Sequence, residues 1–194
     1  GGIIPTFSDI TDLKRAEEQI SHMANHDALT GLPSLRLGKD RLTSAVAHAH
    51  RHDSKVALMF VDLDGFKEVN DTIGHDAGDE VLVGVAKRLT DCVRETDTVA
   101  RIGGDEFTVV ITEVSDKDAI ANVAKKIIDS VSEPFILSDG AAQTTIGASV
   151  GIAIYPDHGK NAEALVRLAD KAMYTVKRRG KNNYVFVDEI DPED

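Results

Sequence analysis

The sequence has little of several residue types, and each shortage excludes a class of protein. Cys92 is the only cysteine among 194 residues, so no disulfide can form within the chain, as is typical of proteins in a reducing cytoplasm. Basic residues are outnumbered 22 to 33 by acidic ones, which makes the formal net charge −11. That charge disfavours a nucleic-acid partner, because a nucleic-acid backbone is itself negative. It does not exclude a single nucleotide, since an acidic site can bind a triphosphate through Mg²⁺.

Long apolar runs and a signal-peptide pattern are also missing from the printed sequence, which argues against a membrane-spanning segment here. The hydrophobic share of 42% and the charged share of 28% are typical of a globular domain. We therefore expect a cytoplasmic fragment that makes no membrane contact itself, and leave open a membrane association of the full-length protein.

Residues 1–25 predict the end of an upstream domain followed by a linker helix. The segment 1–8 is short and apolar, like a final strand, and Asp9-Ile10-Thr11-Asp12 offers capping residues for a helix after it. That helix would carry an apolar stripe with 3-4-3 spacing, formed by Leu13, Ala16, Ile20 and Met23. Such a stripe suits either a coiled coil or packing on its own domain.

Residues 26–188 are expected to form the main domain, with 189–194 as an acidic tail. Val56–Val61 is a continuous apolar run, which predicts a buried central strand. Residues 144–154 alternate between large and small side chains, which predicts a second central strand with a close neighbour on its small-residue face. Tyr184–Val187 predicts an edge strand. The order of helix, strand, helix, hairpin, helix, strand, helix and strand is typical of an α+β fold.

Three helix features have simple structural interpretations. His48 and His52 are spaced like a metal-binding pair, but a solvated helix end is the favoured interpretation. Cys92 lies on an apolar helical stripe, so it is expected in the core rather than as a reactive thiol. A helix is expected to begin at Phe66 and to be interrupted by residues 74–79.

Two acidic clusters suggest chemistry. Asp62 and Asp64 follow the buried strand and share one of its faces, at the carboxyl end where ligand crevices form. Two β-prone runs are joined through Gly103-Gly104-Asp105-Glu106, which predicts a hairpin with a tip that a bulky ligand can approach closely. Adjacent carboxylates there repel each other unless a cation lies between them, and a hard divalent cation with nucleotide phosphates beyond it meets that need. The alternative is a solvated surface hairpin.

Together these residues resemble the GGDEF family of diguanylate cyclases, and the likeness extends from about Asp27 to Asn182. The motifs that carry it are Asp27-Ala28-Leu29-Thr30-Gly31-Leu32, Asp62-Leu63-Asp64-Gly65-Phe66-Lys67, Asn70-Asp71, Gly74-His75-Asp76-Ala77-Gly78-Asp79, Gly103-Gly104-Asp105-Glu106-Phe107 and Ala172-Met173-Tyr174. The resemblance implies a central, mostly antiparallel sheet surrounded by helices, with the ferredoxin-like βααββαβ core of nucleotidyl cyclases and polymerase palms. It also implies that two GTP molecules condense into cyclic di-GMP and two pyrophosphates. A PAS sensor domain would precede residues 1–25.

The resemblance also implies a metal site and a phosphate site. Two Mg²⁺ (or Mn²⁺) ions per active site would be held by Asp62, the carbonyl of Leu63, Asp105 and Glu106, with Glu106 either a ligand or the group that accepts the hydroxyl proton. Gly103 and Gly104 would leave room for the phosphates. The remaining substrate contacts would come from Phe66, Lys67, Lys177 and Lys181, and many relatives have Arg where Lys181 stands.

Guanine presents N1–H and N2–H₂ as donors on one edge, and a carboxylate accepts from both. By resemblance Asp79 takes that role with Asn70 beside it, while the alternative for Asp79 is to cap the helix that follows it. Adenine lacks these donors, so GTP is the expected substrate.

Arg94 and Asp97 stand where the family has its inhibitory product site, with Lys126 as a weaker third member. An Arg-x-x-Asp pair at a helix end is otherwise a common surface pair. Departures from the family pattern are few: Ser34 and Leu35 stand where Asn and Arg are frequent.

The leading interpretation is a cyclase that acts as a homodimer, with each protomer binding one GTP and cyclic di-GMP serving as product and inhibitor. One rival is a catalytically silent receptor for cyclic di-GMP. Another is a regulatory module that binds GTP without turnover.

Overall fold

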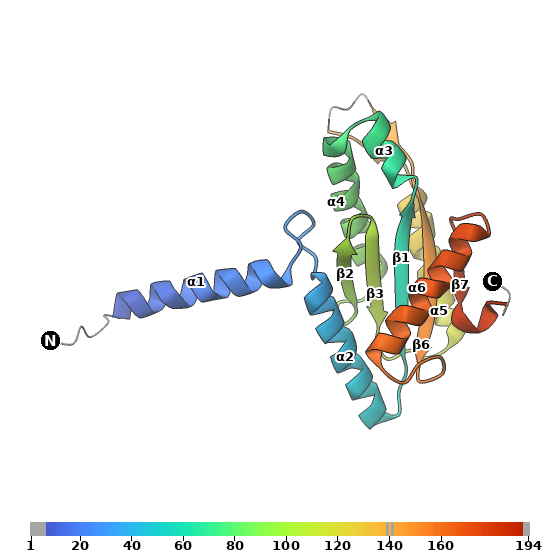
Figure 1. The fold of residues 1–194 in the computed structure, drawn as a ribbon, viewed down its shortest axis with the longest axis horizontal. Helices are drawn as coiled ribbons and strands as arrows, with labels where there is room; N and C mark the ends of the chain where they lie inside the picture. Colours follow the sequence, from blue (N-terminus) through green and yellow to red (C-terminus); the bar gives the residue numbers. More distant parts are fainter. Residues whose placement is uncertain (1–6, 139, 141, 192–194) are drawn as a thin grey trace.

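The computed structural model describes residues 7–138, 140 and 142–191, so the apolar segment before residue 7 and the end of the acidic tail lie outside the described residues. A five-stranded sheet forms the centre, in the order β2-β3-β1-β6-β7 (Figure 1). Its strands are β1 Val56–Asp64, β2 Thr98–Gly103, β3 Glu106–Ile111, β6 Gly147–Tyr155 and β7 Tyr184–Phe186. Only the β6–β7 pair is parallel. The α+β fold, the mostly antiparallel sheet and the edge position of the last strand are confirmed.

Helices cover both faces of the sheet (Figure 1). One face packs against α2 Leu35–His52 and α6 Ala162–Arg178, and the other against α4 His75–Cys92 and α5 Lys117–Ser132. The short helix α3 Phe66–Thr72 follows β1 directly, and a single 3₁₀ turn, η1 Val187–Glu189, follows β7. Cys92 is buried on α4, as predicted. The structure also contains a small antiparallel pair that the sequence did not predict, β4 Phe135–Ile136 with β5 Gln143–Thr144. Strands of two residues are too short to leave a periodic signal in a sequence.

The central strand β1 has a core on each side. Ala57, Met59 and Val61 pack toward α4 and α5, whereas Leu58 and Phe60 pack toward α2 and α6. All nine residues of β1 are buried, which explains why its sequence reads as a continuous apolar run rather than an alternating one. By the period of two along the strand, the side chains of Asp62 and Asp64 lie on the same side of the sheet as Leu58 and Phe60, the side covered by α2 and α6.

The small-residue face of β6 has the close neighbour that its pattern predicts. Helix α6 crosses β6 at Gly151, where a Cβ atom would lie 2.0 Å from the carbonyl oxygen of Ala169 and 2.2 Å from the backbone nitrogen of Met173. The strand and the helix backbone are thus in direct contact, and this fixes where the end of α6 lies relative to the end of β1.

Helix α1 Phe7–Asn25 extends away from the rest of the domain (Figure 1). It begins before Asp9-Ile10-Thr11-Asp12, so the prediction that these residues cap it from outside is wrong: they lie within the helix. Leu13 and Ile20 of the predicted stripe are 62% and 67% exposed, and Ile10 on the same helix is 53% exposed. Packing of the stripe on its own domain is therefore excluded for Leu13 and Ile20.

The break between α3 and α4 is narrower than predicted. Only Ile73 and Gly74 separate the two helices, and Gly74 is the N-cap residue with φ of 117°. Asp79 consequently lies inside α4 instead of preceding it, and the capping alternative for Asp79 is wrong. In the described part of the chain, no helix combines the length and the apolar character needed to cross a bilayer.

We expect Gly151→Ala to destabilise the domain strongly, because the added methyl group meets helix backbone that cannot rotate away. Overpacking of this kind costs about 1–3 kcal/mol, which corresponds to a fall in Tm of roughly 3–10 °C for a domain of this size. Thermal unfolding followed by circular dichroism measures it. Val83→Ala, at a side chain 44% exposed on α4, is the control and should change Tm little. An unchanged Tm for Gly151→Ala would contradict the packing described.

Candidate active site

The hairpin between β2 and β3 places its acidic residues against the end of β1. Gly103 pairs with Glu106, and Gly104 at the tip has φ of 50°, a conformation that glycine adopts without strain. The backbone N–H of Leu63 donates to the carbonyl of Asp105 at 3.1 Å, and Asp62 is the cross-strand neighbour of Glu106. The structure therefore brings Asp62, Asp105 and Glu106 together at one end of the sheet.

The proximity of these carboxylates changes how they bind protons. Burial raises the pKa of Glu106, and the negative charges of Asp62, Asp105 and Asp170 raise it further. Burial also raises the pKa of Asp62, although a hydrogen bond from Lys177 opposes that rise. The ammonium of Lys177 lies 2.5 Å from Asp62 Oδ1. Among the described contacts, Lys177 is the cation that pairs directly with this carboxylate cluster.

A crevice of about 540 Å³ opens beside these carboxylates. We call it the hairpin crevice, and its lining includes Leu63, Phe66, Lys67, Asp105, Lys177 and Lys181. Phe66 is buried at the start of α3, whereas Lys67 and Lys181 are exposed. Three lysines from α3, α6 and the loop after α6 thus meet two acidic strand ends, an arrangement that can take an anionic ligand together with a cation.

Asn70 and Asp79 lie on two helices, α3 and α4, that contact each other. Asn70 on α3 packs against Gly78 on α4, where a Cβ atom would lie 1.9 Å from Asn70 Oδ1. A side chain at position 78 would displace the Asn70 amide, so this glycine is needed for close contact between the two helices. Asp79 is the next residue on α4 and is exposed. The Asn70 amide thus contacts the residue that immediately precedes the exposed Asp79 on α4.

The donor set fits a divalent cation that is shared with a ligand. Within the described residues, no three His, Cys, Asp or Glu side chains form a group that could hold a metal by themselves. His48 and His52 contact each other through tilted rings with centroids 4.2 Å apart. Mg²⁺ is usually held by one or two carboxylates, with water and substrate phosphates completing its shell. Asp105, which lines the crevice, and Asp62, which contacts the lining residue Lys177, suit that mode of binding better than a closed protein cage.

The three residues of the expected product site are arranged differently from a simple ion pair. Asp97 accepts hydrogen bonds from the backbone N–H of Arg94 at 3.0 Å and from that of Thr112 at 3.0 Å. The Arg94 bond is made by the main chain and leaves the guanidinium uninvolved. Lys126 donates to the carbonyls of Asp91 and Cys92 at 3.1 and 3.3 Å, so it stabilises the end of α4.

Sequence reasoning missed the residue that holds the hairpin tip. Arg101 donates to the carbonyl of Gly104 from Nε and Nη2, at 3.1 and 2.8 Å. Its Nη1 donates to both carboxylate oxygens of Asp27, at 3.0 and 3.1 Å, and Asp27 also accepts from Thr30. The turn between α1 and α2 is thereby tied to the hairpin tip. Asp27 and Arg101 are 74 positions apart, and no spacing rule connects them.

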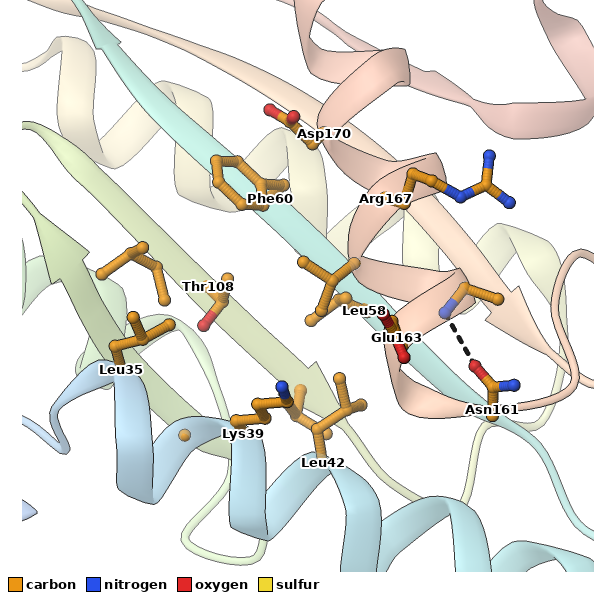
Figure 2. A pocket seen from close by; sticks show the side chains of 15 residues that line it. Leu35, Lys39, Leu42, Leu58, Phe60, Thr108, Asn161, Glu163, Arg167 and Asp170 are labelled. Atoms are coloured by element: carbon orange, nitrogen blue, oxygen red, sulfur yellow. Dashed lines mark hydrogen bonds between the residues drawn. The ribbon is translucent and has the colours of Figure 1, made fainter.

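A second hollow, of about 670 Å³, lies between α2 and α6 over β1 and β3 (Figure 2). Leu42, Leu58 and Phe60 form part of its apolar lining, and Asp170 lies at its upper rim in the view of Figure 2. The negative charge of Asp170 helps to raise the pKa of Glu106, and sequence reasoning missed this residue as well. Its position two helical turns before Lys177 on α6 could have indicated that both face the same site.

Fold and site together define an α+β domain with a crevice at the end of its central strand that both carboxylates and lysines line. The family model described as "Diguanylate cyclase, GGDEF domain" matches residues 24–183, and the chain belongs to the GGDEF family. The bifunctional diguanylate cyclase/cyclic di-GMP phosphodiesterase MucR of Pseudomonas aeruginosa is 44% identical over 176 residues, which are 91% of this chain and 25% of MucR.

Solved structures agree with this assignment. The GGDEF domain of TpbB (YfiN) from Pseudomonas aeruginosa has a TM-score of 0.81 at 41% identity, covering 84% of this chain and 94% of that one. The coiled coil and GGDEF domain of DgcB from Caulobacter crescentus, solved in complex with c-di-GMP, has a TM-score of 0.85 at 28% identity, covering 92% and 94%. The chain spans 25% of the length of MucR and 41% of the length of TpbB.

We expect Glu106→Gln to stabilise the metal-free domain at neutral pH. The pKa of Glu106 lies above its ordinary value of 4.5 in the folded state. Between the ordinary pKa and the raised one, the folded chain therefore binds more protons than the unfolded chain. The free energy of unfolding of the wild type falls as the pH rises through this range. In EDTA, the variant should melt above the wild type at about pH 8, and the gap in Tm should shrink toward about pH 4, where the carboxyl is mostly protonated in both states.

Glu18→Gln on the exposed helix α1 is the matched control and should melt like the wild type at both pH values. A Glu106→Gln variant that is less stable than the wild type at neutral pH would contradict the electrostatic description of the site.

Proposed function

We propose that this domain is a diguanylate cyclase that condenses two GTP molecules into cyclic di-GMP. The observation that carries the proposal is the cluster of Asp62, Asp105 and Glu106 at one end of the sheet. Asp105 lines the adjoining crevice together with Lys177 and Lys181, and Lys177 also contacts Asp62. In each half-reaction a 3′-hydroxyl loses its proton and attacks the α-phosphorus of the other GTP. The bond from the α-phosphorus to the bridging oxygen breaks, and pyrophosphate leaves with the electron pair.

Asp62, the Leu63 carbonyl, Asp105 and Glu106 would hold two divalent cations. Bound there, the cations make the hydroxyl more acidic and neutralise the leaving pyrophosphate. Lys177 and Lys181 would bind the β- and γ-phosphates as compact charges, with Lys177 exchanging Asp62 for a phosphate oxygen. The raised pKa of Glu106 suits a group that accepts the hydroxyl proton, and a ligand role for the same carboxylate stays open.

Guanine recognition would fall to Asn70 and Asp79, and the contact of Asn70 with Gly78 packs α3 against the helix that carries Asp79. Asp79 can accept from both N1–H and N2–H₂ of guanine. With the capping alternative removed, its exposed position inside α4 supports a ligand role.

Catalysis would need a homodimer, because each GTP supplies the nucleophile for the other. The exposed apolar stripe of α1 suits pairing with the same helix of a second copy, and the similar DgcB structure contains a coiled coil beside its GGDEF domain. The ties from Asp27 through Arg101 to Gly104 then give the α1–α2 junction a direct mechanical path to the hairpin tip.

Cyclic di-GMP would also inhibit the enzyme by binding at Arg94 and Asp97. Arg94 is exposed and its guanidinium can pair with the O6/N7 edge of guanine. Asp97 keeps lone pairs for guanine donors beyond those used by the backbone. The hydrogen bonds of Lys126 to α4 make it a poor candidate for direct product contact.

The second candidate function is a silent receptor for cyclic di-GMP or a GTP-binding regulatory module. The complex of DgcB with c-di-GMP supports binding of that dinucleotide as a family property that does not by itself require turnover. The intact cluster of Asp62, Asp105 and Glu106 favours the cyclase.

We expect pyrophosphate and cyclic di-GMP to form from GTP and Mg²⁺, at a rate that rises more steeply than protein concentration because two protomers must meet. Asp105→Ala should lower the rate by at least about a hundredfold, since it removes a group from the reacting centre. Chromatography resolves the product, and a phosphate-coupled assay follows pyrophosphate. Asp118→Ala, at an exposed carboxylate on α5, is the control with unchanged rate. A protein that binds cyclic di-GMP but makes none, after bound nucleotide is stripped and the domains are fused as a dimer, establishes the receptor instead.

We expect added cyclic di-GMP to inhibit the wild type and not Arg94→Ala, because the variant lacks the guanidinium that pairs with guanine. The initial rate without product should be unaffected. Arg51→Ala, another exposed arginine at the end of α2, should stay fully inhibitable. Equal inhibition of Arg94→Ala and the wild type would place the product elsewhere.

A further inference from the structure

The second acidic residue at the end of β1, Asp64, has contacts of its own. Its side chain is buried, with 8% of the residue exposed. The hydroxyl of Ser149 on β6 lies 2.9 Å from Oδ1 and 2.8 Å from Oδ2, and the backbone N–H of Asn182 donates to Oδ2 at 2.9 Å. All the donors that contact it in the described structure are neutral. Asp64 therefore differs from Asp62, which faces Lys177.

The loop that Asp64 contacts has an unusual backbone. Gly180, Lys181 and Asn182 have φ values of 121°, 65° and 47°, and only glycine adopts such values freely. The N–H of Lys181 donates back to the carbonyl of Val176 at 3.0 Å, which closes the end of α6. Two consecutive non-glycine residues in the left-handed region persist only where surrounding contacts hold them.

Asn182 supplies the remaining contacts. Its side-chain oxygen accepts from the N–H of Ala148 at 3.1 Å and lies 3.1 Å from the Ser132 hydroxyl. Gly147 makes room for it, because a Cβ there would lie 2.8 Å from that oxygen. The loop after α6 is thus fixed to β1 through Asp64 and to β6 through Asn182, and Lys181 immediately precedes the anchored residue.

We propose that Asp64 is a positioning residue: by holding the N–H of Asn182 it keeps the loop in the strained conformation that places Lys181 at the hairpin crevice, where it binds the terminal phosphates of a nucleoside triphosphate. This inference rests on the proposed use of the crevice for GTP. A carboxylate suits the role because it can accept from the hydroxyl and the N–H at once. Asp64 itself belongs to the lining of the crevice, but its two carboxylate oxygens are engaged by the Ser149 hydroxyl and the Asn182 N–H. Its proposed effect on phosphate binding is therefore exerted through Lys181.

A purely structural role would lower stability and leave phosphate recognition unchanged, so the test measures phosphate recognition separately. Two ligands serve as probes with Mg²⁺ in calorimetry: GMP, and a GTP analogue with a methylene group between the α- and β-phosphorus, which blocks turnover. The affinity ratio of analogue to GMP reports the contribution of the terminal phosphates. Asp64→Ala should lower that ratio about tenfold, the size of one hydrogen bond to a charged group, with little change in GMP affinity.

Lys181→Ala should lower the ratio to a similar extent, and the double variant should be no worse than either single one, because both act through the same ammonium. Asp64→Asn keeps one acceptor oxygen and should give an intermediate ratio. It also replaces Asp64→Ala if that protein does not fold.

Asn161→Ala is the matched control: it removes the hydrogen bond at 2.8 Å that caps the opposite end of α6 (dashed in Figure 2). It should lower Tm while preserving the affinity ratio. Additive losses in the double variant, or a lowered Tm with an unchanged ratio in Asp64→Ala, would overturn the inference.

The outcomes separate this inference from the cyclase proposal. If the double variant loses no more analogue affinity than either single variant, but the protein makes no cyclic di-GMP, the positioning role is supported and the cyclase is rejected. If the protein makes cyclic di-GMP but the losses of the two single variants add up in the double variant, the cyclase is supported and the positioning role is rejected. A wild type that binds the analogue no better than GMP rejects the positioning role, whereas the cyclase proposal is still decided by product formation.

Discussion

Repulsion among Asp62, Asp105 and Glu106 is the constraint on which the rest of this structure depends. The β1–β3 register makes Asp62 the neighbour of Glu106, and that register cannot slip to separate them. A shift by one residue would turn every β1 side chain to the opposite face, and both faces of β1 are packed. The two cores therefore supply the free energy that keeps an unfavourable charge cluster assembled, as functional sites commonly require.

Contacts from distant parts of the chain offset and orient that cluster. Lys177 comes from α6, Arg101 ties the hairpin tip to Asp27, and Asp64 anchors the loop with Lys181. The position of α6 in turn depends on its close approach to Gly151 of β6. Helix packing, hairpin geometry and the charge balance of the crevice thus depend on one another.

Much of the fold was predictable because its signals are local. The continuous apolar run of β1 and the large-and-small alternation of β6 predicted buried strands, and the period of two correctly put Asp62 and Asp64 on one face. Errors arose where local signals were ambiguous. Asp9-Ile10-Thr11-Asp12 and Asp79 have the composition of caps but lie inside helices, because capping residues are also tolerated in a first or second helical turn.

The sequence by itself determined the fold class, the family and the set of charged residues available at the crevice, since periodicity and short motifs are properties of neighbouring residues. Only the tertiary structure decided how those residues act on one another. It paired Lys177 with Asp62, placed Asp170 within electrostatic reach of Glu106, and gave Arg101 and Asp64 their supporting contacts. The physical reason is that these contacts join residues about 60 to 120 positions apart, and their geometry follows from how whole helices pack on the sheet.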